Sequence, residues 1–318
     1  MDGQQRRQKI FITGGAGFIG ANLTRYLLDG GGCDVTIYDN LSVCLKSNLD
    51  KAIADSKQKG EVNFIQGDVL DFDRLLSAVA GHNAVVHLAA HTRVRESIKS
   101  PGEHLAVNST GTFNVIEAAR QHQIERFIFA SSNAAVGEQI PPVNESMAAK
   151  PISPYGAVKL YGEALCCAYW HSYGLKTVSL RFANAYGPYS DHKTSVVSKF
   201  MRRAKQGKNL EIYGDGMQTR DFVHATDIAQ AIHLVIWRDN FCDTGLWGEV
   251  FQIATGQETK IIDLAQMING LDNFEAKSIK YKSALKGEIR QSFSDITKSR
   301  EVLGFSCCLS LADGLKRI

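Results

Sequence analysis

The chain has 318 residues, of which 44% are hydrophobic and 22% are charged, and its formal net charge at pH 7 is +3. These values are ordinary for a globular protein, and a charge so close to neutral gives no reason to expect nucleic-acid binding. No stretch reaches the roughly 18 apolar residues that a membrane span needs, and the N-terminus lacks an apolar signal core. We therefore expect a cytoplasmic protein that binds neither a membrane nor nucleic acid.

The seven cysteines favour a reducing compartment and argue against a metal site. Their number is odd, and two pairs are adjacent in sequence, Cys166 with Cys167 and Cys307 with Cys308. This spacing suits neither a disulfide framework nor a zinc site. We expect buried, reduced thiols and no bound metal.

Short apolar runs alternate with amphipathic stretches through the first part of the chain. The apolar runs cover residues 10–13, 35–38, 62–65, 84–88, 127–130 and 177–182. The amphipathic stretches between them include residues 23–28, 112–122 and 155–173. This rhythm predicts an α/β fold with a doubly wound parallel sheet and helices on both faces.

The rhythm loosens after Phe182, where glycine-rich turns occur at residues 186–188 and 214–216. We predict that residues 1–182 form mainly a nucleotide-binding domain. Residues 183–318 then form mainly a smaller, mixed substrate-binding region, some segments of which return to the sheet.

A glycine-rich turn follows the first predicted strand. Gly14 permits the tight turn, Gly17 lets the backbone approach a pyrophosphate, and Gly20 lets the next helix pack closely on the strand. Asp39 ends the second strand nineteen residues after Gly20. A carboxylate there accepts hydrogen bonds from an adenosine ribose and repels a 2′-phosphate. The combination predicts a Rossmann domain that binds NAD rather than NADP.

A possible catalytic group follows downstream. Tyr155 and Lys159 are one helical turn apart and share a helix face. A phenol titrates near pH 10, and a neighbouring ammonium together with a positive nicotinamide ring should lower the pKa of Tyr155. Ser132 ends an apolar run, at the strand end where open α/β sheets place ligands. We predict that Ser132, Tyr155 and Lys159 are catalytic, with Ser131 as the alternative serine.

The spacing Gly14-x-x-Gly17-x-x-Gly20, with Tyr155-x-x-x-Lys159, resembles the extended short-chain dehydrogenase/reductase family, from residue 10 to about residue 305. The segments Asp68-Val69, His87-Leu88-Ala89-Ala90 and Asn108-Ser109-Thr110-Gly111 are similar to further motifs of that family. The resemblance favours Ser132 over Ser131, because Ser132 lies five residues before Gly137. It implies NAD contacts at Gly14, Gly17, Phe18, Ile19, Gly20, Asp39, Asn40, Asp68, Val69, Leu88, Ala89, Ala90, Asn108, Tyr155 and Lys159.

Two later segments, residues 181–188 and 218–224, resemble the substrate side of nucleotide-sugar 4-epimerases. The serine is followed by Asn133-Ala134-Ala135, whereas the family's 4,6-dehydratases carry an Asp-Glu pair there and its uronic acid decarboxylases carry a Glu. The resemblance therefore implies NAD-dependent 4-epimerisation of a UDP-hexose or UDP-N-acetylhexosamine. Oxidation at C4 would be transient, so NAD would end the cycle unchanged.

Three alternatives to this function stay open. One is a nucleotide-sugar oxidoreductase such as a 4-ketoreductase, and another is a UDP-uronate 4-epimerase. The third is an NAD-binding module without catalysis, against which the intact Ser132, Tyr155 and Lys159 argue. An epimerase should hold its NAD through turnover, whereas a reductase should consume reduced cofactor.

Several positions bear on the substrate. Arg220 is a candidate ligand of the nucleotide diphosphate, and Lys286 or Arg290 would replace an arginine that the family carries where this chain has Leu285. Arg93 and Arg95 could hold a uronate carboxylate, or Arg95 could pair with a surface acid. Ser292 is small where 4-epimerases often have a bulky residue beside the sugar C2, which predicts room for an N-acetyl group. The predicted substrate contacts are Arg93, Ser132, Asn133, Asn184, Arg220, Arg290 and Ser292.

The resemblance also implies a homodimer, in which the helix carrying Tyr155 pairs with the helix over residues 108–122 across a two-fold axis. We expect apolar positions on these helices to form the self-complementary patch. The candidates are Val115, Ala118, Leu165 and Tyr169.

Overall fold

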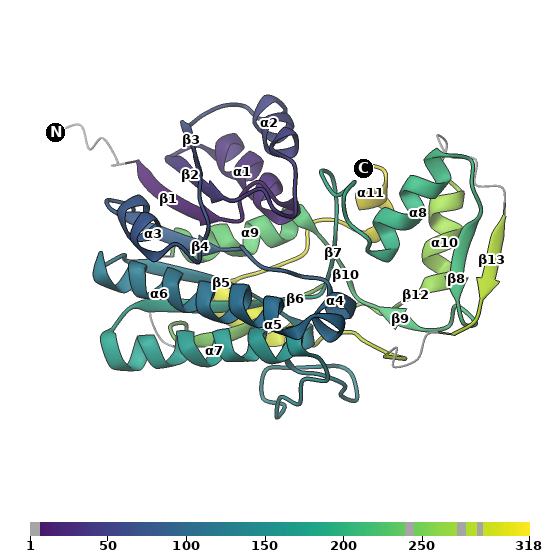
Figure 1. The fold of residues 1–318 in the computed structure, drawn as a ribbon. Helices are drawn as coiled ribbons and strands as arrows, with labels where there is room; N and C mark the ends of the chain where they lie inside the picture. The colour runs from purple at the N-terminus through teal and green to yellow at the C-terminus, as the bar shows by residue number, and fades with distance from the viewer. Residues whose placement is uncertain (1–6, 239–244, 272–277, 285–288) are drawn as a thin grey trace.

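The computed structural model describes residues 7–238, 245–271, 278–284 and 289–318, and a seven-stranded parallel sheet lies at its centre (Figure 1). The strands lie in the order β3, β2, β1, β4, β5, β6 and β11. Their bounds are β1 Gln8–Thr13, β2 Cys33–Asp39, β3 Val62–Gln66, β4 Ala84–His87, β5 Arg126–Ser132, β6 Lys176–Phe182 and β11 Glu249–Ile253. The six strands predicted from sequence are confirmed, and β11 adds a seventh. Chain order reverses between β1 and β4, which makes this point of the sheet the expected ligand crevice.

Helices cover both faces of the sheet (Figure 1). One face carries α1 Phe18–Gly30, α2 Lys46–Ala54 and α9 Ala225–Ile236, and the other carries α3 Phe72–Val79, α6 Gly111–Gln121 and α7 Pro154–Tyr173. Three short helical segments lead from β4 into α6, namely α4 Val94–Lys99, α5 Pro101–Leu105 and the π-helical turn Ala106–Thr110. The predicted doubly wound α/β fold is therefore confirmed.

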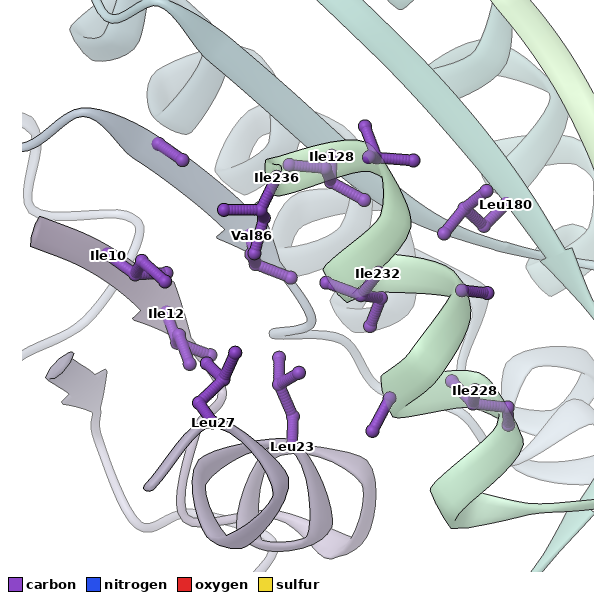
Figure 2. Packing of buried hydrophobic residues seen from close by; sticks show 14 of the residues in the cluster. Ile10, Ile12, Leu23, Leu27, Val86, Ile128, Leu180, Ile228, Ile232 and Ile236 are labelled. Atoms are coloured by element: carbon purple, nitrogen blue, oxygen red, sulfur yellow. The ribbon is translucent and has the colours of Figure 1, made fainter. Parts of the chain in front are cut away.

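The central parts of the strands are mostly apolar because neighbouring residues enter different cores. Ile10 and Ile12 belong to the core under α1 and α9, whereas Phe11 between them belongs to the core under α3, α6 and α7. Strands buried on both faces read as continuous apolar runs, which is the pattern seen in the sequence. Figure 2 shows the first core, in which sheet residues meet two helices through Ile10, Ile12, Val86, Ile128, Leu23, Leu27, Ile228, Ile232 and Ile236.

A smaller region with its own apolar core lies beyond β6. It contains α8 Val196–Lys205, α10 Ile261–Asn269 and α11 Leu311–Leu315. Three two-stranded sheets accompany these helices: β7 Asn184–Tyr186 with β10 Phe222–His224, β8 Leu210–Tyr213 with β13 Ile279–Lys282, and β9 Thr219–Arg220 with β12 Thr259–Lys260. Between α9 and β12 the chain returns to the main sheet, where β11 forms the edge strand beside β6.

The described residues also bear on three compositional expectations. Of the described helices, none combines the length and hydrophobicity required to cross a bilayer. In the same part of the chain, no three His, Cys, Asp or Glu side chains gather as metal ligands. The described cysteines are free thiols, but only Cys33, Cys44 and Cys166 are buried. The expectation of buried thiols is wrong for Cys167 and Cys308, which are exposed.

Most of the residues predicted for a dimer patch are wrong. Val115 and Ala118 are fully buried and Tyr169 is 6% exposed, all within the core under α3, α6 and α7. The apolar stripe that these residues form therefore faces the chain's own sheet and not a second subunit. Large apolar residues that are exposed on these two helices are Phe113, Tyr161 and, at the end of α7, Tyr173.

We expect Leu23→Ala to destabilise the fold strongly, because Leu23 is fully buried between the sheet and α9. Removing a buried leucine side chain typically costs about 2–5 kcal/mol of unfolding free energy. Urea unfolding followed by circular dichroism measures the loss. Ile98→Ala is the control, because Ile98 is 60% exposed and surface changes usually stay within about 0.5 kcal/mol. Equal losses in the two variants would contradict this description of the core.

Candidate active site

A pocket opens at the carboxyl ends of β1, β2 and β4, where the strand order reverses. Its wall includes most of the predicted cofactor contacts, namely Gly14, Gly17, Phe18, Ile19, Gly20, Asp39, Asn40, Val69, Leu88, Ala89 and Ala90. Residues not predicted also line it, among them Ser42, Val43, Cys44, His91, Thr92, Val107, His192 and Lys193.

The glycine-rich turn forms one wall of the pocket. Gly14 has a φ of +71°, and a Cβ atom there would lie 2.5 Å from the backbone nitrogen of Ala89. A Cβ on Gly20 would lie 2.4 Å from the Cα of Gly15, so the helix and the turn touch through backbone. Gly17 is the N-cap of α1 and offers no capping side chain, and the first turn of α1 holds no acidic residue. The amide groups at this helix end are therefore oriented to bind an anion.

Asp39 ends β2 and lies in the pocket wall. One carboxylate oxygen accepts from the backbone N–H of Leu41 at 2.8 Å, and the other accepts from that of Ala16 at 3.1 Å. The thiol of Cys44 lies 3.7 Å from the first oxygen. Burial raises the pKa of Asp39, and these hydrogen bonds oppose that rise. The carboxylate is thus fixed where a ribose diol would meet it. Together with the backbone cradle at Gly14 and Gly20, it fits NAD.

Four predicted cofactor contacts lie outside the pocket wall, namely Asp68, Asn108, Tyr155 and Lys159. The side-chain amide of Asn108 binds the backbone N–H and carbonyl of His91, at 2.8 and 2.9 Å. A carboxylate oxygen of Asp68 accepts from the side chain of Asn40 at 2.8 Å. In the structure Asp68 and Asn108 therefore position wall residues, and direct contacts with NAD at all four positions stay predictions.

Ser132, Tyr155 and Lys159 come together beside the pocket. Tyr155 lies in the first turn of α7, where Ser153 caps the helix and Ser97 accepts from the Tyr155 backbone N–H at 3.2 Å. The hydroxyl of Ser132 accepts from the backbone N–H of Ala134 at 3.2 Å and lies close enough to the Tyr155 phenol to act on its pKa. The amino group of Lys159 donates to the carbonyl oxygen of Ala130 at 2.7 Å and lies 5.8 Å from the centre of the Tyr155 ring.

Burial shifts the pKa values of Tyr155 and Lys159 in opposite directions. Burial raises the pKa of Tyr155 to about 12, although the nearby Ser132 hydroxyl opposes the rise. Burial also lowers the pKa of Lys159 to about 8. Loss of water is the largest cause of the rise in the Tyr155 pKa. The expected lowering includes the charge of a nicotinamide ring, so it stays a prediction for the NAD-bound protein.

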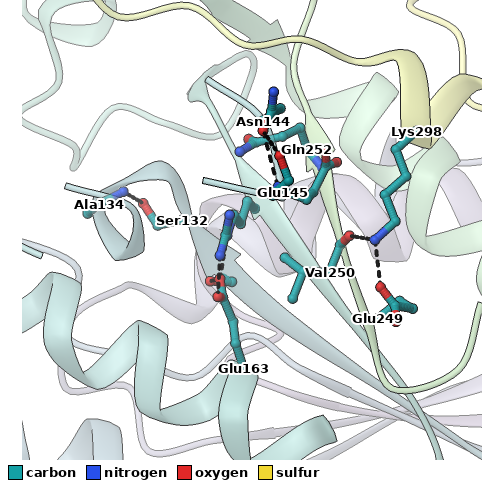
Figure 3. A network of polar contacts seen from close by, with 12 residues as sticks. Ser132, Ala134, Asn144, Glu145, Glu163, Glu249, Val250, Gln252 and Lys298 are labelled. Carbon is teal, nitrogen blue, oxygen red and sulfur yellow. Dashed lines mark hydrogen bonds and ion pairs between the residues drawn. The ribbon is translucent and has the colours of Figure 1, made fainter. Parts of the chain in front are cut away.

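A buried ionic cluster lies next to Ser132, Tyr155 and Lys159. Glu163 lies one helical turn after Lys159 and accepts two hydrogen bonds from Arg181, at 2.8 and 2.7 Å. Both side chains are at most 5% exposed. Glu163 also accepts a hydrogen bond from Ser131. Because Ser131 is engaged there, Ser132 is the serine that faces Tyr155; Figure 3 shows both Glu163 and Ser132.

The segment that carries Ser292 runs close to Ser132. Asn133, the residue after Ser132, donates from its side chain to the Ser294 hydroxyl at 2.9 Å. The carbonyl oxygen of that side chain is buried and accepts no hydrogen bond from the described residues. Asp221 ties this region together, since it accepts from Thr255 and Gly256 of the loop after β11 and from the backbone N–H of Ser294. Ser292 itself is half-buried.

The predicted substrate arginines are distributed differently. Arg220 is half-buried and donates to the carbonyl oxygens of Thr219 and Ile289, at 2.7 and 2.9 Å. Arg93 pairs with Glu96 at 2.6 Å. Arg290 pairs with Asp215 at 2.7 Å, with both side chains exposed. Exposed pairs stabilise by only about 0–1 kcal/mol, so an anionic ligand can compete for either arginine.

Asn184 is exposed at the start of β7. Lys286 lies outside the described residues.

A second hollow lies at the amino ends of β5 and β6, away from the group around Tyr155. Ligands of open α/β sheets bind at the carboxyl ends of the strands, so we assign this hollow no role in the site. Its wall includes Arg120, Glu125, Arg126, Tyr173 and Lys176.

Residues 10–254 match the model of the NAD dependent epimerase/dehydratase family. A dTDP-glucose 4,6-dehydratase from Streptomyces niveus is 33% identical, over 96% of this chain and 90% of that protein. The crystal structure of UDP-glucose 4-epimerase with UDP-glucose from Thermotoga maritima is 32% identical, with a TM-score of 0.86 over 97% of this chain and 96% of that one.

A third similar protein is a UDP-N-acetylglucosamine 4-epimerase from Methanobrevibacter ruminantium in complex with UDP-N-acetylmuramic acid. It is 30% identical, with a TM-score of 0.87 over 98% of this chain and 97% of that one. The family match and these similarities over nearly the full length agree with the glycine-rich pocket and the Ser132–Tyr155–Lys159 group. The chain therefore belongs to the NAD-dependent epimerase/dehydratase family, a group of extended short-chain dehydrogenases/reductases.

Proposed function

We propose that this protein epimerises a nucleotide sugar at C4, with NAD as its cofactor and with Ser132, Tyr155 and Lys159 as catalytic residues. The observation that carries the proposal is that the Ser132 hydroxyl lies beside the Tyr155 phenol, with the buried Lys159 amino group 5.8 Å from the centre of the Tyr155 ring. In the sheet His87 of β4 lies level with Phe129 of β5, so this group stands beside the pocket residues that follow His87.

The roles of the three residues follow from their positions. Bound NAD would supply the hydride acceptor and donor for the sugar C4 and, when oxidised, a positive ring that favours the ionised phenol. Tyr155 takes the proton of the C4 hydroxyl as the sugar is oxidised and gives it back on reduction. Ser132 hydrogen-bonds the same oxygen and keeps the phenol oriented. Lys159 supplies a fixed positive charge, which stabilises the phenolate.

The residues after Ser132 favour epimerisation over dehydration. A 4,6-dehydratase needs an acid to expel the C6 hydroxyl, but residues 133–135 are Asn, Ala and Ala. Asn133 instead presents a buried carbonyl oxygen that accepts no hydrogen bond from the described residues. This oxygen is suited to accept a hydrogen bond from a sugar hydroxyl.

The substrate we propose is a UDP-hexose or a UDP-N-acetylhexosamine. Similar proteins include 4-epimerases named for UDP-glucose and for UDP-N-acetylglucosamine. Arg220 is the candidate for the diphosphate and Asn184 for the nucleotide side. Arg290 is close to Arg220 in space, because the backbone N–H of Thr219 donates to the Arg290 carbonyl oxygen at 2.9 Å. A UDP-uronate is the alternative substrate, and Arg93, in an exposed pair with Glu96, is the candidate to bind its carboxylate.

The two parts of the chain divide these tasks. We propose that residues 1–182 mainly bind NAD and residues 183–318 mainly bind the substrate, with His192 and Lys193 as exceptions in the cofactor pocket. The free thiols favour a reducing compartment such as the cytoplasm.

We also propose a homodimer through α6 and α7. Phe113 is 43% exposed and Tyr161 is 40% exposed, and these large apolar side chains replace the buried residues predicted from sequence. Exposed apolar groups on two neighbouring helices suit a two-fold interface.

We expect Tyr155→Phe to lower kcat by about 10²–10⁴-fold while the amount of bound NAD stays unchanged. The variant removes one hydroxyl group, and the backbone contacts of α7 remain. The measurement is turnover of UDP-glucose and UDP-N-acetylglucosamine, together with NAD content after acid release. Tyr173→Phe, at an exposed position on the same helix, is the control. Activity above about a tenth of the parent would mean that another group moves the proton. Stoichiometric consumption of NADH would favour the 4-ketoreductase instead.

We expect Ser292→Tyr to discriminate against the N-acetyl substrate. If Ser292 lies beside the sugar C2, a large ring fills the space that the N-acetyl group occupies. Overpacking typically costs about 1–3 kcal/mol, so the ratio of kcat/KM values should shift by roughly 10- to 100-fold toward the plain hexose. Gln291→Tyr, at the exposed neighbouring residue, is the control. An unchanged ratio in Ser292→Tyr would remove Ser292 from the sugar pocket.

We expect Phe113→Glu to convert the dimer into monomers, because the substitution places a charge in the proposed apolar interface. Light scattering at micromolar concentration measures the mass, and one chain has a mass of 34.9 kDa. Tyr281→Glu, at a residue that is 57% exposed on β13, should leave the dimer intact. A parent protein that is already monomeric would refute the proposal.

A further inference from the structure

The segment of residues 187–193, which we call the strap, crosses from the smaller region to the cofactor-binding half. It leaves β7 and is fastened to α1 and α2 by side-chain hydrogen bonds. These join Asn22 to the Pro188 carbonyl at 2.9 Å, Arg25 and Asp55 to the Tyr189 hydroxyl at 3.0 and 2.8 Å, and Asn48 to His192 at 3.2 Å.

The strap ends at the cofactor pocket. His192 and Lys193 lie in the same pocket wall as Gly17 at the start of α1 and Asp39 at the end of β2. The amino group of Lys193 donates to the hydroxyl of Thr92 at 3.3 Å. Lys193 therefore brings a cation to the pocket from a part of the chain that does not belong to the glycine-rich turn.

The surroundings of Lys193 lack a negative charge. Among the described residues no carboxylate lies within ion-pair distance of its amino group, whereas neighbouring Arg93 is paired with Glu96. Burial lowers the pKa of Lys193, and the charge of Arg93 lowers it further. The Cys44 thiol offers no compensating charge at neutral pH, because burial raises its pKa to about 12. An anion bound in the pocket would relieve this uncompensated charge.

We infer that Lys193 binds the diphosphate of the cofactor, opposite the amino end of α1, and that the strap thereby retains the cofactor. The inference rests on the proposed function in that it takes NAD as the resident cofactor. In NAD the negative charge is on the diphosphate, between the two riboses. Asp39 lies where the adenosine ribose would bind, at one end of the cofactor. Thr92 follows β4, which lies beside β5, the strand that ends at Ser132, so it is nearer the other end. The diphosphate lies between these two ends, where Lys193 is.

The test compares Lys193→Met with Lys199→Met, which removes the same charge from a half-buried lysine whose amino group contacts the Tyr213 hydroxyl. Two quantities are measured on the purified proteins. The first is NAD per chain and its rate of exchange with isotopically labelled NAD. The second is the affinity for NAD, ADP-ribose and adenosine by direct titration. Thermal unfolding of each variant shows that the fold is intact.

We expect Lys193→Met to bind NAD and ADP-ribose about 10- to 100-fold more weakly, the loss typical of a hydrogen bond to a charged group. Exchange of NAD should become faster, and affinity for adenosine, which has no phosphate, should stay as in the parent. Lys193→Arg should recover most of the affinity, because it keeps the charge. Lys199→Met should behave as the parent.

Other results overturn the inference. Unchanged NAD affinity in Lys193→Met removes the lysine from the site while leaving the proposed function in place. An equal loss for adenosine means that Lys193 acts on the ribose or on strap packing and not on the diphosphate. A parent chain that holds no NAD and binds none in titration overturns both the inference and the proposed function.

Discussion

The amino group of Lys159 donates to the carbonyl oxygen of Ala130 and lies 4.8 Å from the centre of the Phe129 ring, inside the protein. A buried ammonium is unfavourable unless polar groups surround it, and the carbonyl and the Glu163 carboxylate do so here. Glu163 is held in turn by Arg181 on β6. The position of this one charge therefore requires β5, β6 and α7 to be packed together. Tyr155 lies one turn earlier on the same helix and is positioned by that packing.

Much of the cofactor half could be predicted from the sequence, because its signals are local. Gly14 and Gly20 precede and enter α1, and Asp39 ends the next strand, so each can be placed from its neighbours in the chain. Tyr155 and Lys159 share a helix face through their spacing alone. Strands buried on both faces are similarly distinct, since they are rich in apolar residues on both faces, and each of the six predicted runs became a strand.

The features that were missed depend on contacts between distant segments. Lys193 enters the cofactor pocket from beyond β7, and nothing in its neighbours indicates this. Val115 belongs to an apolar stripe on its helix, and this stripe faces the sheet. Periodicity predicts which side of a helix is buried, but it does not predict whether the sheet or a partner subunit covers that side. The pKa of Tyr155 depends on how completely the site is buried, which spacing does not report. Asp221 holds two loops together through backbone groups, which no motif encodes.

Backbone atoms make the tightest part of the cofactor pocket, since even a methyl group on Gly14 would collide with the main chain at Ala89. The proposed sugar side is built differently, from side chains such as those of Asn133 and Ser292. Mutations in the first set disrupt the fold, whereas mutations in the second change the shape of a cavity and leave the fold intact. Evolution can therefore revise one half while the other is conserved. Descendants of a single ancestral chain can acquire new sugars, or even new reactions, and still inherit the same way of holding the nucleotide.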